Sequence, residues 1–279
     1  MARAHRAYRE RPLLGCAPAH LARLLRWVQL MSPIRPLPPV ISCARGAKGA
    51  HVKRIQEWLT LRGYGVALDG DFGPATERAL AMFCAAGAAA SWNGVADEIV
   101  VNALERPMLD AVADVRPVPD DLRSAVCDVA AQHLREHPRE VGGQNRGPWV
   151  RLYMDGREGK DWKWCAGFVW YVLAQAAKQL GVPMPLKPSY SCSTFVERNR
   201  GGRFLPGESP QLVRRGDVFF VRRAGDDAGY QHTGIVVDVQ PDHVVTIEGN
   251  TNDEGSREGY EVCRRVRAYG RLDFLSIAG

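Results

Sequence analysis

Three residue types that together perform thiol catalysis occur in the C-terminal half of this 279-residue chain. Cys165 stands in the stretch WKWCAGFVWYV, His232 begins HTGIVVDV, and Glu248 ends VVTIE. Such catalysis needs a thiolate that attacks, an imidazole that moves the proton and a polar group that orients the imidazole. Asn250, two residues after Glu248, is an alternative orienting group. The residue types therefore suggest nucleophilic catalysis by a thiolate, provided that the fold brings them together.

The residues that follow Cys165 have the pattern of an amphipathic helix that begins at the cysteine. Apolar side chains recur at helical spacing, at Phe168, Val172, Ala176 and Leu180. Gly181 and Pro183 predict the end of this helix, and Asp161 is a candidate cap at its beginning. In the first helical turn the dipole and the unpaired backbone N–H groups favour a thiolate. A buried cysteine with no chemical role could also occupy this place.

Successive strands are expected to carry the histidine and the glutamate. The runs VFFV, HTGIVVDV and VVTIEGN predict three antiparallel strands with short connections. If the second and third pair through a turn at residues 240–243, His232 and Glu248 lie nearly opposite each other. A carboxylate that orients an imidazole requires such a position.

The chain divides into four parts by its sequence patterns. Residues 1–45 form a basic extension, residues 46–106 a compact unit of three helices, residues 107–118 a linker, and residues 119–279 the domain with the candidate site. In the second part the turn DGDFG precedes a helix that starts at Pro74. The last part begins with a helix from about Asp120 to His137.

Residues 46–106 resemble the type-1 family of peptidoglycan-binding domains. The resemblance rests on the stretches GAKGAHVKRIQEWL, RGYGVALDGDFGPATERAL and NGVADEIVVNAL. This chain has Cys84 where the family usually has glutamine, and a longer AAGAAAS segment precedes the third helix. The resemblance implies a small three-helix domain that binds the cell wall.

Residues 119–279 resemble the CHAP family of cysteine, histidine-dependent amidohydrolases and peptidases, within the papain-like superfamily. WKWCAGFVWYV, RRGDVFFV, HTGIVVDV, IEGNTN and VCRRVRAYGRLDFLSI carry this resemblance. It implies an α+β fold in which helices pack on an antiparallel sheet. It also implies cleavage of an amide in peptidoglycan, either between the sugar and L-alanine or within the peptide, as endolysins and autolysins do. The sequence does not choose between amidase and endopeptidase.

The roles implied by this resemblance follow the order of the residues. Cys165 attacks the amide carbon and forms a thioester, while its backbone N–H helps to stabilise the oxyanion. His232 takes the thiol proton and later supplies one to the leaving amine. Glu248 orients His232, with Asn250 as the alternative. Trp162 and Trp164 either line the substrate cleft or pack against the sheet.

Other assignments compete within the same domain. His243 could replace Glu248 as the orienting residue, although it falls in the predicted turn. Cys192, in SYSCSTF, is the alternative nucleophile, and it is expected to lie in a loop. A wall-binding protein with a catalytically silent second domain and a thiol amidase that acts on another amide are the competing functions.

Metal sites were weighed at three places, and none is expected. His133 and His137 match the H-x-x-E-H pattern of zinc enzymes, but Pro138 follows at once, no third ligand is evident, and a solvated helix face explains the two histidines better. DGDFG lacks the ligand spacing of a calcium loop. Asp155 and Asp161 precede Cys165, where some relatives bind calcium, but they form no D-x-D loop. No cofactor is expected.

Composition restricts the function classes further. The first 45 residues hold eight arginines and one acid, a net +7, which leaves the rest of the +6 chain at −1 and disfavours a nucleic-acid groove. No apolar run is long enough to span a membrane. Seven irregularly spaced cysteines indicate buried thiols rather than a disulfide framework. We expect a monomer that is made in the cytoplasm without a clear signal peptide and acts at the cell wall.

Overall fold

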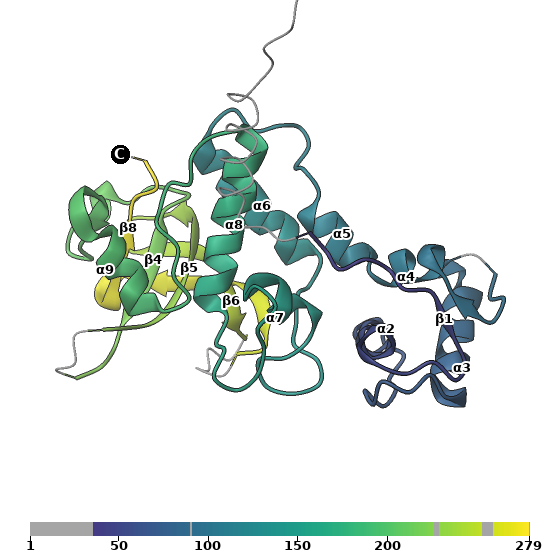
Figure 1. Cartoon of the computed structure of the whole chain (residues 1–279). Helices are drawn as coiled ribbons and strands as arrows, with labels where there is room; N and C mark the ends of the chain where they lie inside the picture. The colour runs from purple at the N-terminus through teal and green to yellow at the C-terminus, as the bar shows by residue number, and fades with distance from the viewer. Residues whose placement is uncertain (1–35, 90, 226–228, 253–258, 279) are drawn as a thin grey trace, which may run out of the picture. The chain divides into compact units, whose positions relative to one another are not determined.

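The computed structural model describes residues 36–278 except residue 90, residues 226–228 and residues 253–258. Most of the predicted basic extension, residues 1–35, therefore lies outside the described residues. The fold is α+β, with helices packed against a six-stranded antiparallel sheet. Figure 1 shows this sheet and its helices in the C-terminal half of the chain.

Residues 43–112 form short helices around an apolar core. The elements are β1 (Cys43–Ala44), α2 (Ala50–Leu61), α3 (Pro74–Phe83), a π-helical turn (Cys84–Ala88), β2 (Val95–Ala96), α4 (Glu98–Leu104) and α5 (Arg106–Val112). Trp58, Leu80 and Phe83 are buried between them. Three of these helices fall where the sequence predicted them, while α5 occupies the first half of the predicted linker. Pro107 starts α5 favourably, and Met108 and Ala111 bury its inner face, so this segment is helical rather than extended.

The DGDFG turn is held by one buried amide. The Gln56 side chain donates to the Asp69 carboxylate at 2.8 Å and to the Thr76 hydroxyl at 3.1 Å, and it accepts from the Gly70 N–H at 2.8 Å. The Asp69 carboxylate also accepts the backbone N–H of Asp71 at 2.9 Å. These hydrogen bonds give Asp69 and Gln56 a structural role, which is to hold the turn.

The C-terminal part contains all strands of the main sheet. Its elements are α6 (Leu122–Arg135), α7 (Pro148–Tyr153), α8 (Cys165–Leu180), α9 (Cys192–Arg203), β3 (Phe204–Leu205), a 3₁₀ turn (Pro210–Leu212), β4 (Val218–Arg222), β5 (Tyr230–Val239), β6 (His243–Thr251), β7 (Glu261–Ala268), a 3₁₀ turn (Tyr269–Arg271) and β8 (Leu272–Leu275). The strand order is β3-β8-β4-β5-β6-β7, and every pair is antiparallel. The three strands predicted around VFFV, HTGIVVDV and VVTIEGN are confirmed as β4, β5 and β6.

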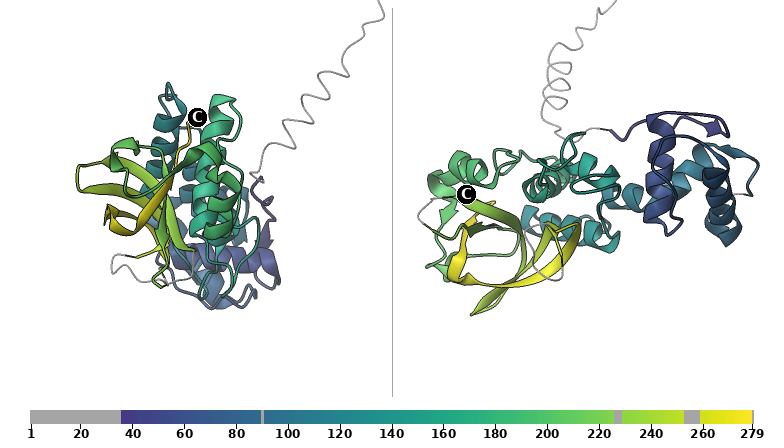
Figure 2. Two further views of the ribbon diagram at one scale, coloured as in Figure 1. Left: turned by 90° about the vertical axis from the view of Figure 1, so that its left-hand side faces the viewer. Right: turned by 90° about the horizontal axis from the view of Figure 1, so that it is seen from below.

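Helix α8 is the centre of this domain and is buried over most of its length. It contacts α6 on one side and β5 and β6 on the other, as the two views in Figure 2 also show. Along β4, Val218 and Phe220 face the main core while Phe219 faces a second apolar cluster, because side chains alternate between the faces of a sheet. The sheet therefore has apolar packing on both faces, and its strands are rich in β-branched and aromatic residues.

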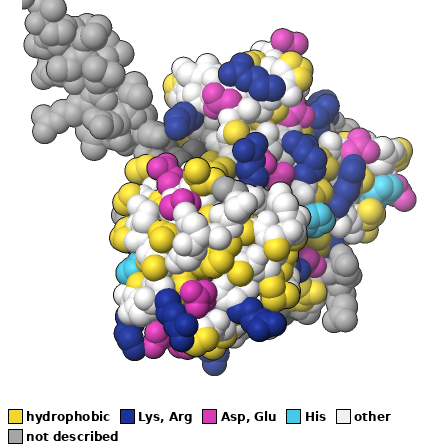
Figure 3. Space-filling view, turned by 90° about the vertical axis from the view of Figure 1, so that its right-hand side faces the viewer, with side chains coloured by type: hydrophobic (Ala, Val, Ile, Leu, Met, Phe, Trp, Pro, Cys, Tyr) yellow, Lys and Arg dark blue, Asp and Glu magenta, His cyan; other side chains and the backbone are white. Residues whose placement is uncertain are grey.

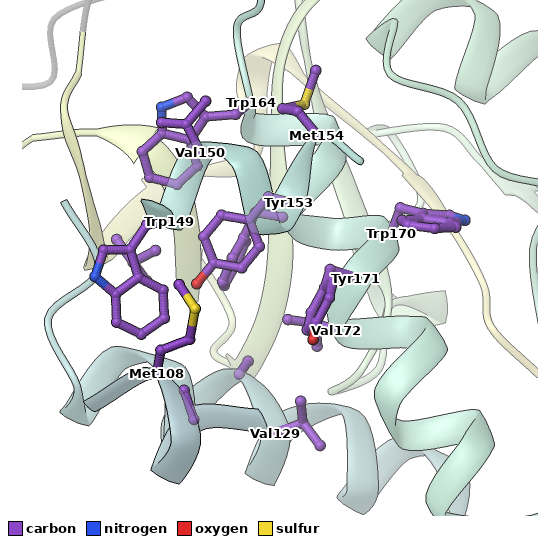
Figure 4. Packing of buried hydrophobic residues seen from close by; sticks show 14 of the residues in the cluster. Met108, Val129, Trp149, Val150, Tyr153, Met154, Trp164, Trp170, Tyr171 and Val172 are labelled. Carbon is purple, nitrogen blue, oxygen red and sulfur yellow. The ribbon is translucent and has the colours of Figure 1, made fainter. Parts of the chain in front are cut away.

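Aromatic side chains fix the start of α8 against α7. The Tyr153 ring stacks on Trp164 with 5.5 Å between centroids and on Trp149 with 6.2 Å. Figure 4 shows these three rings side by side, with Tyr171 of α8 next to them. A Cβ at Gly167 would lie 2.5 Å from the Tyr153 carbonyl oxygen, so only glycine allows α8 to approach α7 this closely.

His133, at the end of α6, is fully buried in this aromatic cluster. Its Nδ1 lies 2.9 Å from the Tyr153 hydroxyl and its Nε2 lies 3.0 Å from the Gln175 Oε1. Burial lowers its pKa to about 4, although the hydrogen bond with Gln175 opposes this change. The expectation that His133 belongs to a solvated helix face is therefore wrong: it is a buried, neutral imidazole, and its partners are neutral side chains.

This histidine is expected to make the fold sensitive to acid. The unfolded chain binds a proton at His133 near pH 6.5, but the folded chain resists it until about pH 4. The stability that the neutral ring contributes is thus present above pH 6.5 and is lost as the pH falls toward 4, by about 3 kcal/mol. Urea unfolding at pH 7.5 and pH 4.5 measures the loss. His133→Gln should reduce this difference, whereas a control variant, His51→Gln, should leave it as in wild type. If the unfolding free energy changed equally between the two pH values in all three proteins, the assignment to His133 would be contradicted.

Surface charges are mixed on the side of the molecule that Figure 3 displays. Basic and acidic side chains are interspersed there with apolar atoms. Among the exposed side chains of the molecule, the Lys48 ammonium lies 2.6 Å from the Asp71 carboxylate. Among the described residues, no helix combines the length and apolar character required to cross a membrane.

Candidate active site

Cys165 is the first residue of α8, as the sequence predicted. The thiol is 5% exposed and lies at one wall of a surface cleft. No side chain of the preceding loop caps the helix, and the predicted cap, Asp161, instead lies in the cleft wall. The backbone N–H of Ala166 is directed at the Cys165 sulfur. The helix start therefore offers this sulfur a hydrogen-bond donor and the positive end of a dipole.

His232 on β5 lies next to the cysteine and is held by Glu248 on β6. The His232 Nε2 is 2.7 Å from the Glu248 carboxylate, and the imidazole is close enough to Cys165 for each group to shift the pKa of the other. With Nε2 turned toward the carboxylate, Nδ1 is the ring nitrogen left for the sulfur. These contacts join a nucleophile, a base and an orienting group in the arrangement that thiol catalysis requires.

The register between β5 and β6 differs from the one expected. Ile235 pairs with Ile247, so continuing the ladder by one residue places Gly234 opposite Glu248, and His232 is its diagonal neighbour on the same face. A Cβ at Gly234 would lie 2.8 Å from the Glu248 Cγ. The absence of a side chain at Gly234 therefore lets the carboxylate reach across to the histidine.

Glu248 has no exposed surface and is surrounded by donors. Its oxygens accept from the Thr246 hydroxyl and from two nitrogens of the Arg267 guanidinium, in addition to His232. Burial alone would raise the pKa of this carboxyl, but the bonds to Arg267 and His232 outweigh it and lower the pKa to about 2. Glu248 is therefore ionised throughout the range in which proteins usually work.

The charges at the site favour a thiolate paired with an imidazolium. The hydrogen bond from Cys192 and the neighbouring His232 lower the pKa of the Cys165 thiol well below its ordinary value, against the effect of burial. Burial also opposes the charged form of His232, but Cys165 and Glu248 raise its pKa to about 9. At pH values between the pKa of Cys165 and the pKa of His232, the imidazole carries the proton and the sulfur is a thiolate.

Asn250 does not contact His232 in the described structure but supports the cysteine loop. Its side-chain oxygen accepts the backbone N–H of Trp164 at 3.1 Å, one residue before Cys165. Its amide nitrogen donates to the Asn145 Oδ1 at 3.2 Å. The backbone of Asn250 has φ 53°, which turns its side chain out of the regular strand pattern. Between the two sequence alternatives, the geometry favours Glu248 as the group that orients the imidazole.

The cleft beside Cys165 has a volume of about 680 Å³ and a mixed wall. Trp162, which is 36% exposed, and Tyr190 form its aromatic part. The Arg157 guanidinium lies 5.2 Å from the Trp162 ring and 5.7 Å from the Tyr190 ring, so a cation joins the two. Charged side chains complete the wall, from Lys160, Asp161, Lys163 and Arg223. Such a surface suits a substrate with both apolar and polar groups.

Trp164, the second tryptophan predicted at the cleft, is in the core. Its ring is fully buried against Tyr153, and its indole N–H donates to the Glu140 carboxylate at 2.8 Å. A Cβ at Gly249 would lie 2.8 Å from this ring, which shows how closely β6 packs on it. The expectation that Trp164 lines the cleft is therefore corrected: it supports the loop that carries Cys165.

The competing residues of the sequence analysis lie in other places. His243 starts β6 and contacts the Asp242 carboxylate at 2.7 Å, at the opposite end of the strand from Glu248. Asp155 lies 3.7 Å from Arg157. Cys192 begins α9 rather than lying in a loop, and its sulfur is 3.7 Å from that of Cys165. Of these competitors, only Cys192 is brought to the site.

The sequence analysis missed two neighbours of the site, of which only Thr246 had a signal in the sequence. Arg267 is one of three arginines in the stretch RRVRA, and it pairs with Val244 in the β6–β7 ladder, so only its long side chain brings it to Glu248. Thr246 precedes Glu248 by two residues, so strand alternation could have identified it as a neighbour on the same face.

Comparison with known proteins agrees with this geometry over part of the chain. Residues 156–250 match the family model of the CHAP domain. The matched span includes Cys165, His232, Glu248 and Asn250, whereas α6, α7, β7 and β8 lie outside it. CHAP domains are generally cysteine-dependent amidases or peptidases, so the match supports a CHAP-family hydrolase with a general role on peptidoglycan. No curated protein and no solved structure matches the chain.

Proposed function

We propose that this protein is a peptidoglycan hydrolase that cleaves an amide bond with Cys165 as nucleophile. The observation that carries the proposal is the 2.7 Å hydrogen bond that joins His232 to the buried Glu248 carboxylate, beside a Cys165 that lines an open cleft. The CHAP match over the same residues supports the substrate class.

The first chemical step forms a thioester. The Cys165 thiolate attacks the carbonyl carbon of the amide, and the carbonyl oxygen becomes an oxyanion near the backbone N–H groups at the start of α8. The His232 imidazolium then gives its proton to the amide nitrogen, the C–N bond breaks, and the amine leaves. Glu248 keeps the ring oriented and stabilises its positive charge until the proton has moved.

The second step restores the enzyme. Neutral His232 takes a proton from a water molecule, and the resulting hydroxide attacks the thioester carbon. The C–S bond breaks, the acid product leaves and Cys165 returns as a thiolate beside protonated His232. The product is an amine and a carboxylic acid, and both an amidase and an endopeptidase would use this route.

Residues 46–106 are proposed to hold the enzyme on the wall. Their resemblance to peptidoglycan-binding domains and the helices α2, α3 and α4 support this role. A chain made in the cytoplasm would then act at the wall as a monomer, in the manner of an endolysin or autolysin.

Fragment analysis tests the hydrolase proposal and identifies the bond. Purified peptidoglycan is incubated with the protein, and the soluble products are separated and weighed by mass spectrometry. We expect new fragments with a free amine and a free carboxyl. A free muramic carboxyl would indicate an amidase, and a shortened peptide an endopeptidase. Intact peptidoglycan after prolonged incubation would refute the proposal. Co-sedimentation of the chain with insoluble wall in the same tubes tests the binding role.

A further inference from the structure

A second buried thiol lies against the candidate nucleophile. The sulfur of Cys192 is 3.7 Å from the sulfur of Cys165, within hydrogen-bond distance for this element. The two residues are 8% and 5% exposed, and both line the same cleft. The distance does not show which sulfur donates the hydrogen bond. The charges around the two sulfurs indicate which one keeps its proton and therefore donates.

Cys192 is held in place from two sides. It is the first residue of α9, where the Ser191 side chain caps the helix by accepting the Thr194 N–H at 3.4 Å. The next residue, Ser193, accepts the Tyr230 N–H at 2.9 Å and donates to the Tyr230 carbonyl oxygen at 3.4 Å. Tyr230 precedes His232 by two residues on β5. The first turn of α9 is therefore tied to the strand that carries the base.

The charged groups around the two sulfurs indicate which one keeps its proton. His232 of β5 lowers the pKa of Cys165. His232 is in turn hydrogen-bonded to Glu248 of β6, which accepts from Arg267 of β7. Arg223, after β4, acts on Cys192 and by itself favours a thiolate there. The effect of the His232 imidazolium on Cys165 outweighs that of Arg223 on Cys192, so Cys165 carries the charge and Cys192 the proton.

The remaining titratable groups of the cleft are Lys160, Asp161 and Lys163 of the loop before α8, together with Tyr190 and Tyr230. Burial raises the pKa of Tyr230 to about 12, so its hydroxyl stays neutral, and the three charged side chains are exposed. Exposed charges are screened by solvent, so their influence on the buried pair of sulfurs is small.

We infer that Cys192 is a positioning residue, whose thiol donates a hydrogen bond to the Cys165 sulfur and holds that sulfur charged beside His232. The direction of both pKa changes agrees with this assignment: the contact lowers the pKa of Cys165 and raises that of Cys192. The inference rests on the proposed function only for its effect on turnover, because a thiolate can be detected without any wall substrate.

The test is the pH dependence of alkylation at Cys165. The protein is first reduced with a phosphine, because thiols this close can be oxidised to a disulfide. Iodoacetamide is then applied between pH 4 and pH 10, and the rate is read from the mass of the peptide that contains Cys165. In Cys192→Ala we expect the midpoint to rise by about one pH unit, since a hydrogen bond to a charged group has been lost. Cys192→Ser keeps a hydrogen-bond donor, so its midpoint should lie close to that of the wild type.

Turnover on peptidoglycan should change in parallel. At a pH below the wild-type midpoint, kcat of Cys192→Ala should fall about tenfold with KM unchanged, because a rise of one unit in the pKa lowers the thiolate fraction there by about ten. Cys127, a buried cysteine of α6, supplies the matched control pair, Cys127→Ala and Cys127→Ser, which should keep the wild-type midpoint.

Two results would overturn the inference. An unchanged midpoint in Cys192→Ala would show that the contact does not stabilise the thiolate. Equal shifts in the alanine and serine variants would show that Cys192 acts by its volume and not as a donor. Circular dichroism confirms that each variant is folded. If peptidoglycan is not cleaved but the alkylation midpoints shift as expected, the proposed function fails and the inference about the thiols stands.

Discussion

Cys165→Ala is expected to reduce the release of peptidoglycan fragments to the background rate, a loss of at least about 10⁴-fold in turnover. Without the sulfur no thioester forms, and the imidazole and the backbone donors remain without a nucleophile to assist. The fold should survive the change, because a buried thiol is replaced by a smaller apolar group at a helix start. Fragment release, followed by the appearance of new amines, measures the loss.

The control for this variant is a cysteine that lies away from the cleft. Cys84 is buried in the turn after α3, so Cys84→Ala should retain full turnover if it folds. Substantial activity in Cys165→Ala would assign the nucleophile to another group. Cys192 would then be the nearest thiol to examine, because its sulfur is only 3.7 Å away.

Glu248→Gln is expected to lower turnover by about 10²- to 10⁴-fold and also to destabilise the fold. The amide has nearly the same shape as the carboxylate but no charge to stabilise the His232 imidazolium. It also leaves the Arg267 guanidinium without its buried counter-charge, and breaking a buried pair costs about 3 kcal/mol or more. Turnover and denaturant unfolding measure the two effects independently.

The pH profile separates this role of Glu248 from a merely structural one. The pKa of His232 is about 9 in the wild type, so activity should be lost as the pH rises through that value. In Glu248→Gln the alkaline limb should move to lower pH, because the imidazolium is less stable. The acid limb should not move to higher pH, because His232 is already protonated there and the loss of a nearby negative charge does not disfavour the Cys165 thiolate. The active range therefore narrows from its alkaline side.

A matched exchange on the surface provides the control. Glu208 is exposed and lies 3.5 Å from Arg222, so Glu208→Gln should change neither turnover nor the pH profile. An unchanged alkaline limb in Glu248→Gln would refute the assignment of Glu248 as the group that orients His232. Asn250→Ala should instead reduce activity without moving that limb, because Asn250 holds the Trp164 N–H and not the imidazole.

The Glu248 carboxylate also stabilises the fold, and this contribution is lost in strong acid. The pKa of Glu248 is lowered from 4.5 to about 2, so its contribution to folding is present above pH 4.5 and is lost as the pH falls through 2. Loss of stability at milder acidity, between pH 6.5 and pH 4, belongs instead to His133. The two groups thus act in different pH windows.

Local sequence patterns predicted the elements of the site well. The start of α8 at Cys165 and the strands β4, β5 and β6 are confirmed because each depends on spacing and turn chemistry within a few residues. The end of α8 at left-handed Gly181, φ 66°, is confirmed for the same reason. The segment 107–118 was predicted as a linker, and its first half lies in α5 because Met108 and Ala111 bury the inner face of that helix.

Side-chain environments were predicted less well than elements. His133 and Trp164 were placed at the surface or at the cleft, and both are fully buried. A residue at the edge of an apolar stripe can face solvent or a neighbouring helix, and periodicity along one chain segment does not distinguish the two. His133 and Trp164 are buried because α7 packs against α6 and α8.

By itself the sequence determined the order Cys165, His232 and Glu248, the helix on which the cysteine begins and the strands that carry the other two. Only the tertiary structure decided that Glu248 reaches His232 diagonally past Gly234, that Arg267 balances the buried carboxylate, and that Cys192 lies against the nucleophile. The physical reason is the range of each interaction. Helices and strands follow from contacts between near neighbours in the chain, whereas register, buried charge pairs and the contact of two thiols depend on segments that meet only after the sheet and α8 have packed.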